Sequence, residues 1–170
     1  MRLINAAVPS DTHTRLADQA YGPAGRQRLD VYLPVTLAPE APIAVFFYGG
    51  SWNSGSPDDY SFIARALAPE GFVVVLAGYR LHPQVRFPAM LEDTAAAVAW
   101  THTNIARHGG DPNRIVLMGH SAGAAHVAQY VGHPQFHVVP GSGLAGAVLL
   151  SGLFDPVTAE SNPPLQAYFG

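Results

Sequence analysis

The sequence predicts an α/β protein in which a mostly parallel sheet is flanked by helices. Continuous apolar runs, typical of strands buried on both faces, recur along the chain. Segments of helical character separate these runs. The length of 170 residues and the hydrophobic fraction of 48% suit one ordinary domain with a buried core. We therefore treat residues 1–170 as a single domain.

The strands are expected in the following order. Residues 1–25 are polar and irregular, with a weak strand signal, and are expected to form a cap or an irregular segment. Residues 28–33 alternate between polar and apolar, which predicts a half-exposed edge strand that ends at Pro34. Buried strands are then predicted from the apolar runs at 43–48, 72–77, 114–118 and 144–150.

Helices are predicted between these strands. Ser56 is a suitable cap for a helix over 56–70. A second helix over 88–108 ends at a Gly-Gly pair, and an Ala-rich third spans 122–131. The apolar stripe of the second helix has helical spacing and consists of Leu91, Ala95, Val98 and Ile105, with Trp100 on its flank. In such alternating folds, ligands bind beyond the carboxyl ends of the strands.

Composition excludes several classes of function. The net charge of −3 argues against nucleic-acid binding, which needs clustered basic residues. The absence of cysteine excludes disulfides, thiolate metal sites and a cysteine nucleophile. No apolar stretch is long enough to span a membrane. The first residues lack the apolar core of a secretory signal, so a cytoplasmic location is expected.

The strongest motif is Gly119-His120-Ser121-Ala122-Gly123, which reads G-x-S-x-G. It follows a predicted strand and opens a predicted helix, as a nucleophile elbow requires. The tight turn exposes the serine hydroxyl, and larger side chains at the glycines would collide with the neighbouring strand and helix. The serine is therefore the candidate nucleophile; an incidental serine on a Gly-rich turn is the alternative.

A second Gly-rich turn follows the strand at 43–48. Acyl transfer needs N–H donors directed at a developing oxyanion, and small residues let the backbone approach a substrate carbonyl. The expected donors are the amides of Gly50 and Ser51, together with that of Ala122 after the nucleophile. A plain strand-to-helix turn is the alternative.

Four further residues are candidates near these turns. Trp52 and Tyr79 are expected either to line a substrate pocket or simply to pack. His120, within the elbow, is a third candidate for the substrate pocket, although its side chain is expected to point away from the serine hydroxyl. Asp93, near the start of the second helix, is expected to have a structural role.

These motifs together resemble the α/β-hydrolase fold, in particular the esterase/lipase branch related to hormone-sensitive lipase and kynurenine formamidase. The resemblance covers about residues 28–155, with the matching stretches in the family's order. It implies a serine hydrolase that needs neither a metal nor an organic cofactor. The stretches that carry it are 29–34, 48–52, 78–81, 87–89, 110–115 and 119–123.

The sequence departs from the family's pattern in two ways. Tyr48 stands where the family's oxyanion loop has a histidine. The resemblance also implies the order serine, acid, histidine, yet no histidine follows Asp155. His126 is expected to face solvent or a neighbouring element, and neither His133 nor His137 is expected to act as the base.

The resemblance therefore implies that the triad acid and histidine lie beyond residue 170, and that the chain is the N-terminal portion of a hydrolase. Without further strands, the strand at 144–150 would be an exposed apolar edge, which favours self-association.

A serine hydrolase of small carboxylic esters is the main functional hypothesis. An arylformamidase or other amidase is an alternative, because both reactions use the same machinery. A non-catalytic α/β-hydrolase scaffold that binds a ligand is a further alternative. A nucleotide-binding protein is not supported, because the phosphate-binding glycine motifs are absent.

Overall fold

The computed structural model describes residue 5 and residues 11–154 and 163–169. Within these residues the strands form one sheet in the order β1-β2-β4-β3-β5-β6. The first two pairings in that order are antiparallel and the rest are parallel. This sheet confirms the predicted α/β class. The strands are β1 (His13–Ala20), β2 (Arg28–Pro34), β3 (Ala41–Phe47), β4 (Val73–Ala77), β5 (Gly110–His120) and β6 (Gly146–Leu150).

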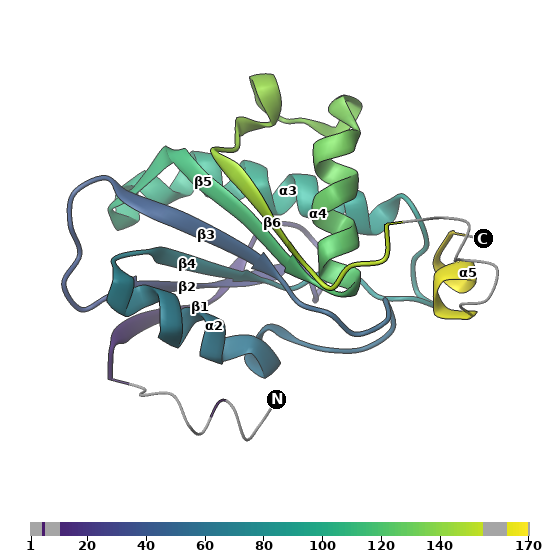
Figure 1. Ribbon diagram of the computed structural model, residues 1–170, viewed down its shortest axis with the longest axis horizontal. Helices are drawn as coiled ribbons and strands as arrows, with labels where there is room; N and C mark the ends of the chain where they lie inside the picture. Colours follow the sequence, from purple (N-terminus) through teal and green to yellow (C-terminus); the bar gives the residue numbers. More distant parts are fainter. Residues whose placement is uncertain (1–4, 6–10, 155–162, 170) are drawn as a thin grey trace.

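Helices cover both faces of the sheet (Figure 1): α2 lies on one face, and α3 and α4 lie on the other. Right-handed crossovers explain this arrangement. In the sheet, β4 lies on one side of β3 and β5 lies on the other. The connection from β3 to β4 therefore runs in the opposite direction to the connection from β4 to β5, and the helices of these two connections lie on opposite faces. The helices are α2 (Ser61–Leu67), α3 (Ala89–Asn104), α4 (Ala122–Gly132) and α5 (Pro163–Phe169). Short 3-10 turns are η1 (Pro57–Tyr60), η2 (Ala68–Glu70), η3 (Ile105–His108), η4 (Pro134–Phe136) and η5 (Pro140–Gly143).

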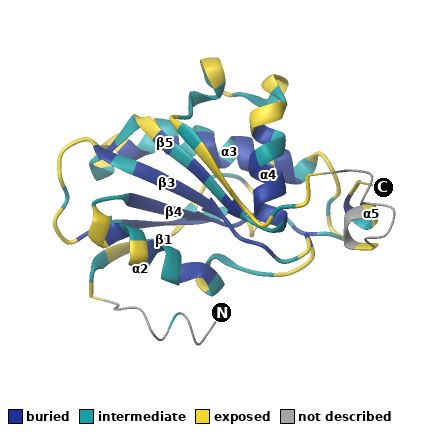
Figure 2. Ribbon diagram, in the orientation of Figure 1, coloured by how far each residue is buried: buried dark blue, intermediate teal, exposed yellow. Residues whose placement is uncertain are grey.

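The core follows the predicted patterns closely. Strands β3 and β4 are almost entirely buried (Figure 2), as their continuous apolar runs predict. The apolar stripe of the second helix is buried along α3 and η3. The helix predicted over 56–70 is instead α2 between two 3-10 turns, each with a proline at its start: Pro57 is the first residue of η1, and Pro69 is the second residue of η2.

The amino-terminal part of the sheet corrects two expectations. Residues 13–20 form the edge strand β1, and β2 is a largely buried inner strand. The alternation in β2 was misleading because its polar residue Asp30 is buried. Asp30 accepts hydrogen bonds from the guanidinium of Arg15 (2.6 Å) and the amide of Asp18 (2.8 Å). Strand β1 gave little signal because its register shifts between Leu16 and Gln19, which breaks the period of two.

Strand β6 forms the other edge of the described sheet, and its apolar side chains are exposed (Figure 2). Val148, Leu149 and Leu150 are all at least a third exposed. None of the described helices is both long and apolar enough to cross a membrane.

Asp93 in α3 has the structural role expected for it. Its fully buried carboxylate accepts hydrogen bonds from the side-chain amide of Gln27 (2.7 Å) and from the backbone amide of Arg80 (2.8 Å). It also pairs with the guanidinium of Arg80 at 2.7 Å. The segment after β4 is thereby fixed to α3.

Candidate active site

The two Gly-rich turns meet at the carboxyl ends of adjacent parallel strands. Phe47, the last residue of β3, is paired with Gly119 near the end of β5. The chain leaves β3 toward α2 on one face and leaves β5 toward α4 on the other (Figure 1). In α/β sheets in general, ligands bind where the chain diverges in this way at the carboxyl ends of the strands.

Ser121 lies on the sharp turn between β5 and α4. Its backbone angles are φ 54° and ψ −119°, a combination that residues with a side chain rarely adopt. The turn is held because the Ser121 amide donates to the carbonyl of Leu150 (2.8 Å) and its carbonyl accepts from Ala124 (3.0 Å). Such strained backbone is typical of functional sites. Ser121 thus has the geometry of a nucleophile elbow.

The two glycines of the motif are required by space. A Cβ on Gly119 would collide with the carbonyl of Gly123, and a Cβ on Gly123 would collide with the carbonyl of Phe47. These contacts confirm that the neighbouring strand and helix leave no room for side chains here.

The turn after β3 approaches the nucleophile directly. A Cβ on Gly49 would lie 2.8 Å from the Cβ of Ser121. Next to it, Gly50 has φ 156° and Ser51 has φ 50°, and the carbonyl of Gly50 accepts from the amide of Ser54 (3.0 Å). The amide of Ala122 is in the first turn of α4, where N–H groups have no acceptor within the helix. The three expected donors therefore belong to two turns that meet beside Ser121.

Trp52 and Tyr79 both have packed surroundings. Trp52 is 2% exposed, and its ring is stacked on that of Tyr168 from α5, with ring centres 5.4 Å apart. Tyr79 is fully buried, and its hydroxyl donates to the carbonyl of Tyr48 (2.7 Å). Both residues are thus packed in and beside the Gly-rich turn after β3, which we call the oxyanion turn, and this agrees with the packing alternative.

His120 forms a hydrogen bond between its Nδ1 and the hydroxyl of Tyr60 in η1 (2.9 Å). This bond joins the residue before the nucleophile to the 3-10 turn that follows the oxyanion turn.

His126 takes the second of the two orientations expected for it, toward neighbouring elements. Its ring does not face solvent but is fully buried among the rings of Trp52, Tyr79 and Tyr168. Neither ring nitrogen has a hydrogen-bond partner among the described residues. Burial lowers the pKa of His126 from 6.5 to about 3. A residue of this basicity is a poor proton acceptor for a serine at neutral pH.

The other histidines described after Ser121 are bound to backbone. His133 Nδ1 contacts the carbonyl of Gln129, and His137 Nε2 contacts that of Tyr130, both at 2.8 Å. Asp155 lies outside the described residues. Among the described residues, no cluster of His, Asp and Glu side chains has the arrangement of a metal site.

Sequence reasoning missed Arg26, which contacts the oxyanion turn from the loop between β1 and β2. Its guanidinium donates to the hydroxyl of Tyr48 (2.8 Å) and to the carbonyl of Gly55 (2.6 Å). The tyrosine at position 48 is the one signal in the sequence for this contact, because a buried hydroxyl needs a hydrogen-bond partner.

A mixed sheet with a strained serine on the turn after a central parallel strand defines the α/β-hydrolase fold. The resemblance to its esterase branch is confirmed by comparison with known proteins. The chain belongs to the BD-FAE family, whose profile matches residues 29–138.

Two curated relatives illustrate the similarity. A probable isoprenylcysteine alpha-carbonyl methylesterase of Oryza sativa subsp. japonica is 37% identical over 150 residues, which are 88% of this chain and 32% of the relative. A kynurenine formamidase of Danio rerio is 36% identical over 157 residues, which are 89% of this chain and 51% of the relative. The chain thus spans about a third of the length of the first relative and about half of the second.

Among solved structures, an esterase of Pyrobaculum calidifontis matches with a TM-score of 0.75 and 26% identity. The match covers 99% of this chain and 56% of that structure. Almost the whole chain therefore follows the architecture of this esterase.

Proposed function

We propose that this chain forms the nucleophile-bearing part of a serine hydrolase that cleaves small carboxylic esters. The proposal rests on the close approach of the Gly49 backbone to Ser121, whose own backbone angles are strained. Relatives named as esterases support the choice of an ester as substrate.

In the proposed reaction, the hydroxyl oxygen of Ser121 attacks the ester carbonyl while a histidine base takes its proton. The carbonyl π electrons move to oxygen, and the amides of Gly50, Ser51 and Ala122 stabilise the resulting oxyanion. Collapse of the intermediate expels the alcohol, which receives the proton from the histidine. Water then hydrolyses the acyl-enzyme by the same steps in reverse order.

The base and the acid of this mechanism are proposed to follow residue 170 in the natural polypeptide. Two observations support this. Each relative described above extends well beyond the region that it shares with this chain. Among the described histidines after Ser121, His126 is buried with a lowered pKa, and the other two are bound to α4 carbonyls.

The proposal is tested with a fluorophosphonate probe, which labels an activated serine, and with p-nitrophenyl acetate. We expect both signals from the natural polypeptide at its full length and neither from its Ser121→Ala variant. The 170-residue chain alone is expected to be nearly inactive, because loss of triad members leaves only about 10³–10⁴-fold catalysis over water. A folded full-length protein that takes no label would instead be a binding scaffold.

An arylformamidase is the second candidate, supported by the similarity to kynurenine formamidase. Paired assays with an aryl ester and an aryl formamide of matched leaving group separate the two. A higher kcat/KM on the formamide would favour the amidase.

A further inference from the structure

Arg26 contacts three points around the oxyanion turn. One guanidinium nitrogen donates to the hydroxyl of Tyr48 and to the carbonyl of Gly55, at 2.8 Å and 2.6 Å. Its Nε donates to the carbonyl of Tyr79 at 3.0 Å. The first two acceptors lie at the beginning and the end of residues 48–55, which we call the oxyanion loop. A single side chain thus connects both ends of this loop to the segment after β4.

The ring of Tyr48 is itself firmly packed. It is stacked on Tyr79, with ring centres 4.4 Å apart, and lies beside Tyr60 at 6.4 Å. Gly55 also lies against this ring, because a Cβ at position 55 would be 2.8 Å from a ring carbon of Tyr48. Burial raises the pKa of the Tyr48 hydroxyl, which therefore stays protonated at neutral pH and accepts from Arg26 as a neutral group.

The oxyanion loop needs such external support. Three successive residues have positive φ, namely Gly50 (156°), Ser51 (50°) and Trp52 (61°). For the two residues with side chains, this conformation costs about 1–3 kcal/mol each and persists only when the surroundings impose it.

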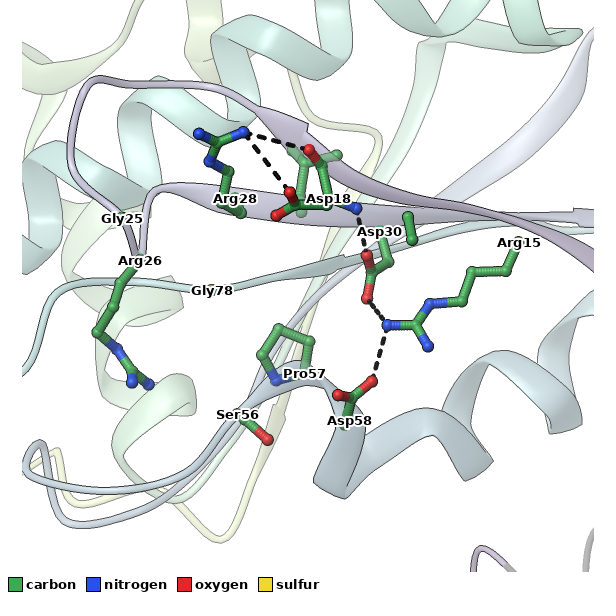
Figure 3. A pocket seen from close by; sticks show the side chains of 12 residues that line it. Arg15, Asp18, Gly25, Arg26, Arg28, Asp30, Ser56, Pro57, Asp58 and Gly78 are labelled. Carbon is green, nitrogen blue, oxygen red and sulfur yellow. Dashed lines mark hydrogen bonds and ion pairs between the residues drawn. The ribbon is translucent and has the colours of Figure 1, made fainter.

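Arg26 differs from the other arginines in its neighbourhood. A cavity of about 260 Å³ lies beside Arg26. Among its lining residues, Arg15 pairs with Asp30 and Asp58, and Arg28 is linked to Asp18 (Figure 3). Arg26 points away from these groups, and within the described part of the chain it forms no ion pair. Its donors are used on the oxyanion loop and on the segment behind it.

We propose that Arg26 is a positioning residue, which acts through the Tyr48 hydroxyl and the Gly55 carbonyl to hold the amides of Gly50 and Ser51 at Ser121. The inference rests on the proposed function, because it assigns these amides to the oxyanion. A displacement of about 1 Å in such a site costs on the order of 10²-fold in rate. Tyr48, which replaces the histidine of the resembling family, provides the hydroxyl that Arg26 binds.

The test uses the natural polypeptide at full length and the variants Arg26→Met, Arg26→Lys, Tyr48→Phe and the Arg26→Met/Tyr48→Phe double variant. Arg28→Met is the matched control, because it removes a half-exposed arginine of the same hairpin whose guanidinium, among the described residues, has polar contacts with Asp18 alone. We expect Arg26→Met to lower kcat by about tenfold or more with little change in KM, because the oxyanion forms only in the transition state. Arg26→Lys should recover part of this loss.

The double variant and hydrogen exchange separate positioning from general destabilisation. If Arg26 acts through Tyr48, the double variant should lose little more than Arg26→Met alone. Amides of residues 48–55 should exchange faster in Arg26→Met and in Tyr48→Phe, while amides of β3 and β5 should not. Tyr48→Phe keeps the packed ring, so it provides this information even if Arg26→Met fails to fold.

Three results would overturn the inference. One is a kcat of Arg26→Met no lower than that of Arg28→Met, and another is unchanged exchange in the oxyanion loop. The third is additive losses in the double variant, which would mean that the two residues act separately. An inactive wild type with faster loop exchange in the variants would instead refute the proposed function and leave the contact between Arg26 and the loop in place.

Discussion

Gly49 and Ser121 are so close that a Cβ on the glycine would lie 2.8 Å from that of the serine. This approach joins the turn after β3 to the turn after β5, and it depends on the absence of a side chain. Real Cβ atoms do not come this close, so a side chain at position 49 would displace one of the two turns.

Gly49→Ala is therefore expected to lower kcat/KM for esters by at least about tenfold, because the nucleophile and the oxyanion amides would move apart. The steady-state rate with p-nitrophenyl acetate measures this. Gly132→Ala is the control, because nothing lies within 4 Å of a Cβ at that position. Equal activities of the two variants would contradict the close approach.

Ser121→Gly is expected to raise the free energy of unfolding by about 1 kcal/mol. Glycine relieves the strain of φ 54° and ψ −119°, while its greater freedom in the unfolded chain offsets part of the gain. Ser121→Ala keeps the strain and is the control. Urea denaturation measures the free energy of unfolding of both variants. A glycine variant no more stable than the alanine variant would argue against strain at the elbow.

The buried His126 predicts a specific dependence of stability on pH. Its pKa is lowered from 6.5 to about 3 in the folded protein, so the unfolded chain binds an extra proton between these values. Stability from this group is present above pH 6.5 and is lost as the pH falls toward 3, by about 1.4 kcal/mol per pH unit.

His126→Phe removes this titration and should flatten the difference in unfolding free energy between pH 6.5 and about pH 4.5. Above pH 6.5 the pH dependence of both proteins should run parallel. If the wild type and the variant lose stability at the same rate on acidification, His126 is not the group responsible.

Asp93→Asn is expected to cost about 3 kcal/mol of stability, because it removes the buried charge that Arg80 and Gln27 bind. Glu92→Gln provides the control on the same arginine. Glu92 lies 3.5 Å from Arg80 and its side chain is 55% exposed, so its loss should change stability by less than about 1 kcal/mol. Chemical denaturation compares the two variants, and similar losses would contradict the distinction between the buried and the exposed carboxylate.

The exposed edge of β6 predicts that the isolated 170-residue chain self-associates. Leu149→Lys should raise the fraction of monomer on size exclusion, because a charge on an apolar edge opposes pairing. Val35→Lys is the control, since Val35 is 72% exposed but lies outside the strands. A sharp monomer peak from the unchanged chain at high concentration would count against the prediction.

Much of the fold was predictable because its signals are local. Continuous apolar runs identify β3 and β4, since a strand buried on both faces has no polar positions. The serine motif was equally clear, because the turn that exposes Ser121 requires glycine at 119 and 123. From these two features alone, the sequence determined the α/β class and the position of the candidate nucleophile.

Only the tertiary structure decided which polar groups are buried and what they contact. Asp30 makes β2 resemble an edge strand, yet Arg15 neutralises it inside the sheet. His126 is buried by aromatic rings from the oxyanion turn, the segment after β4 and α5. Arg26 reaches Tyr48 across 22 positions of the chain. Partners so distant in sequence leave no periodic pattern, so their contacts arise only when the sheet brings the loops together.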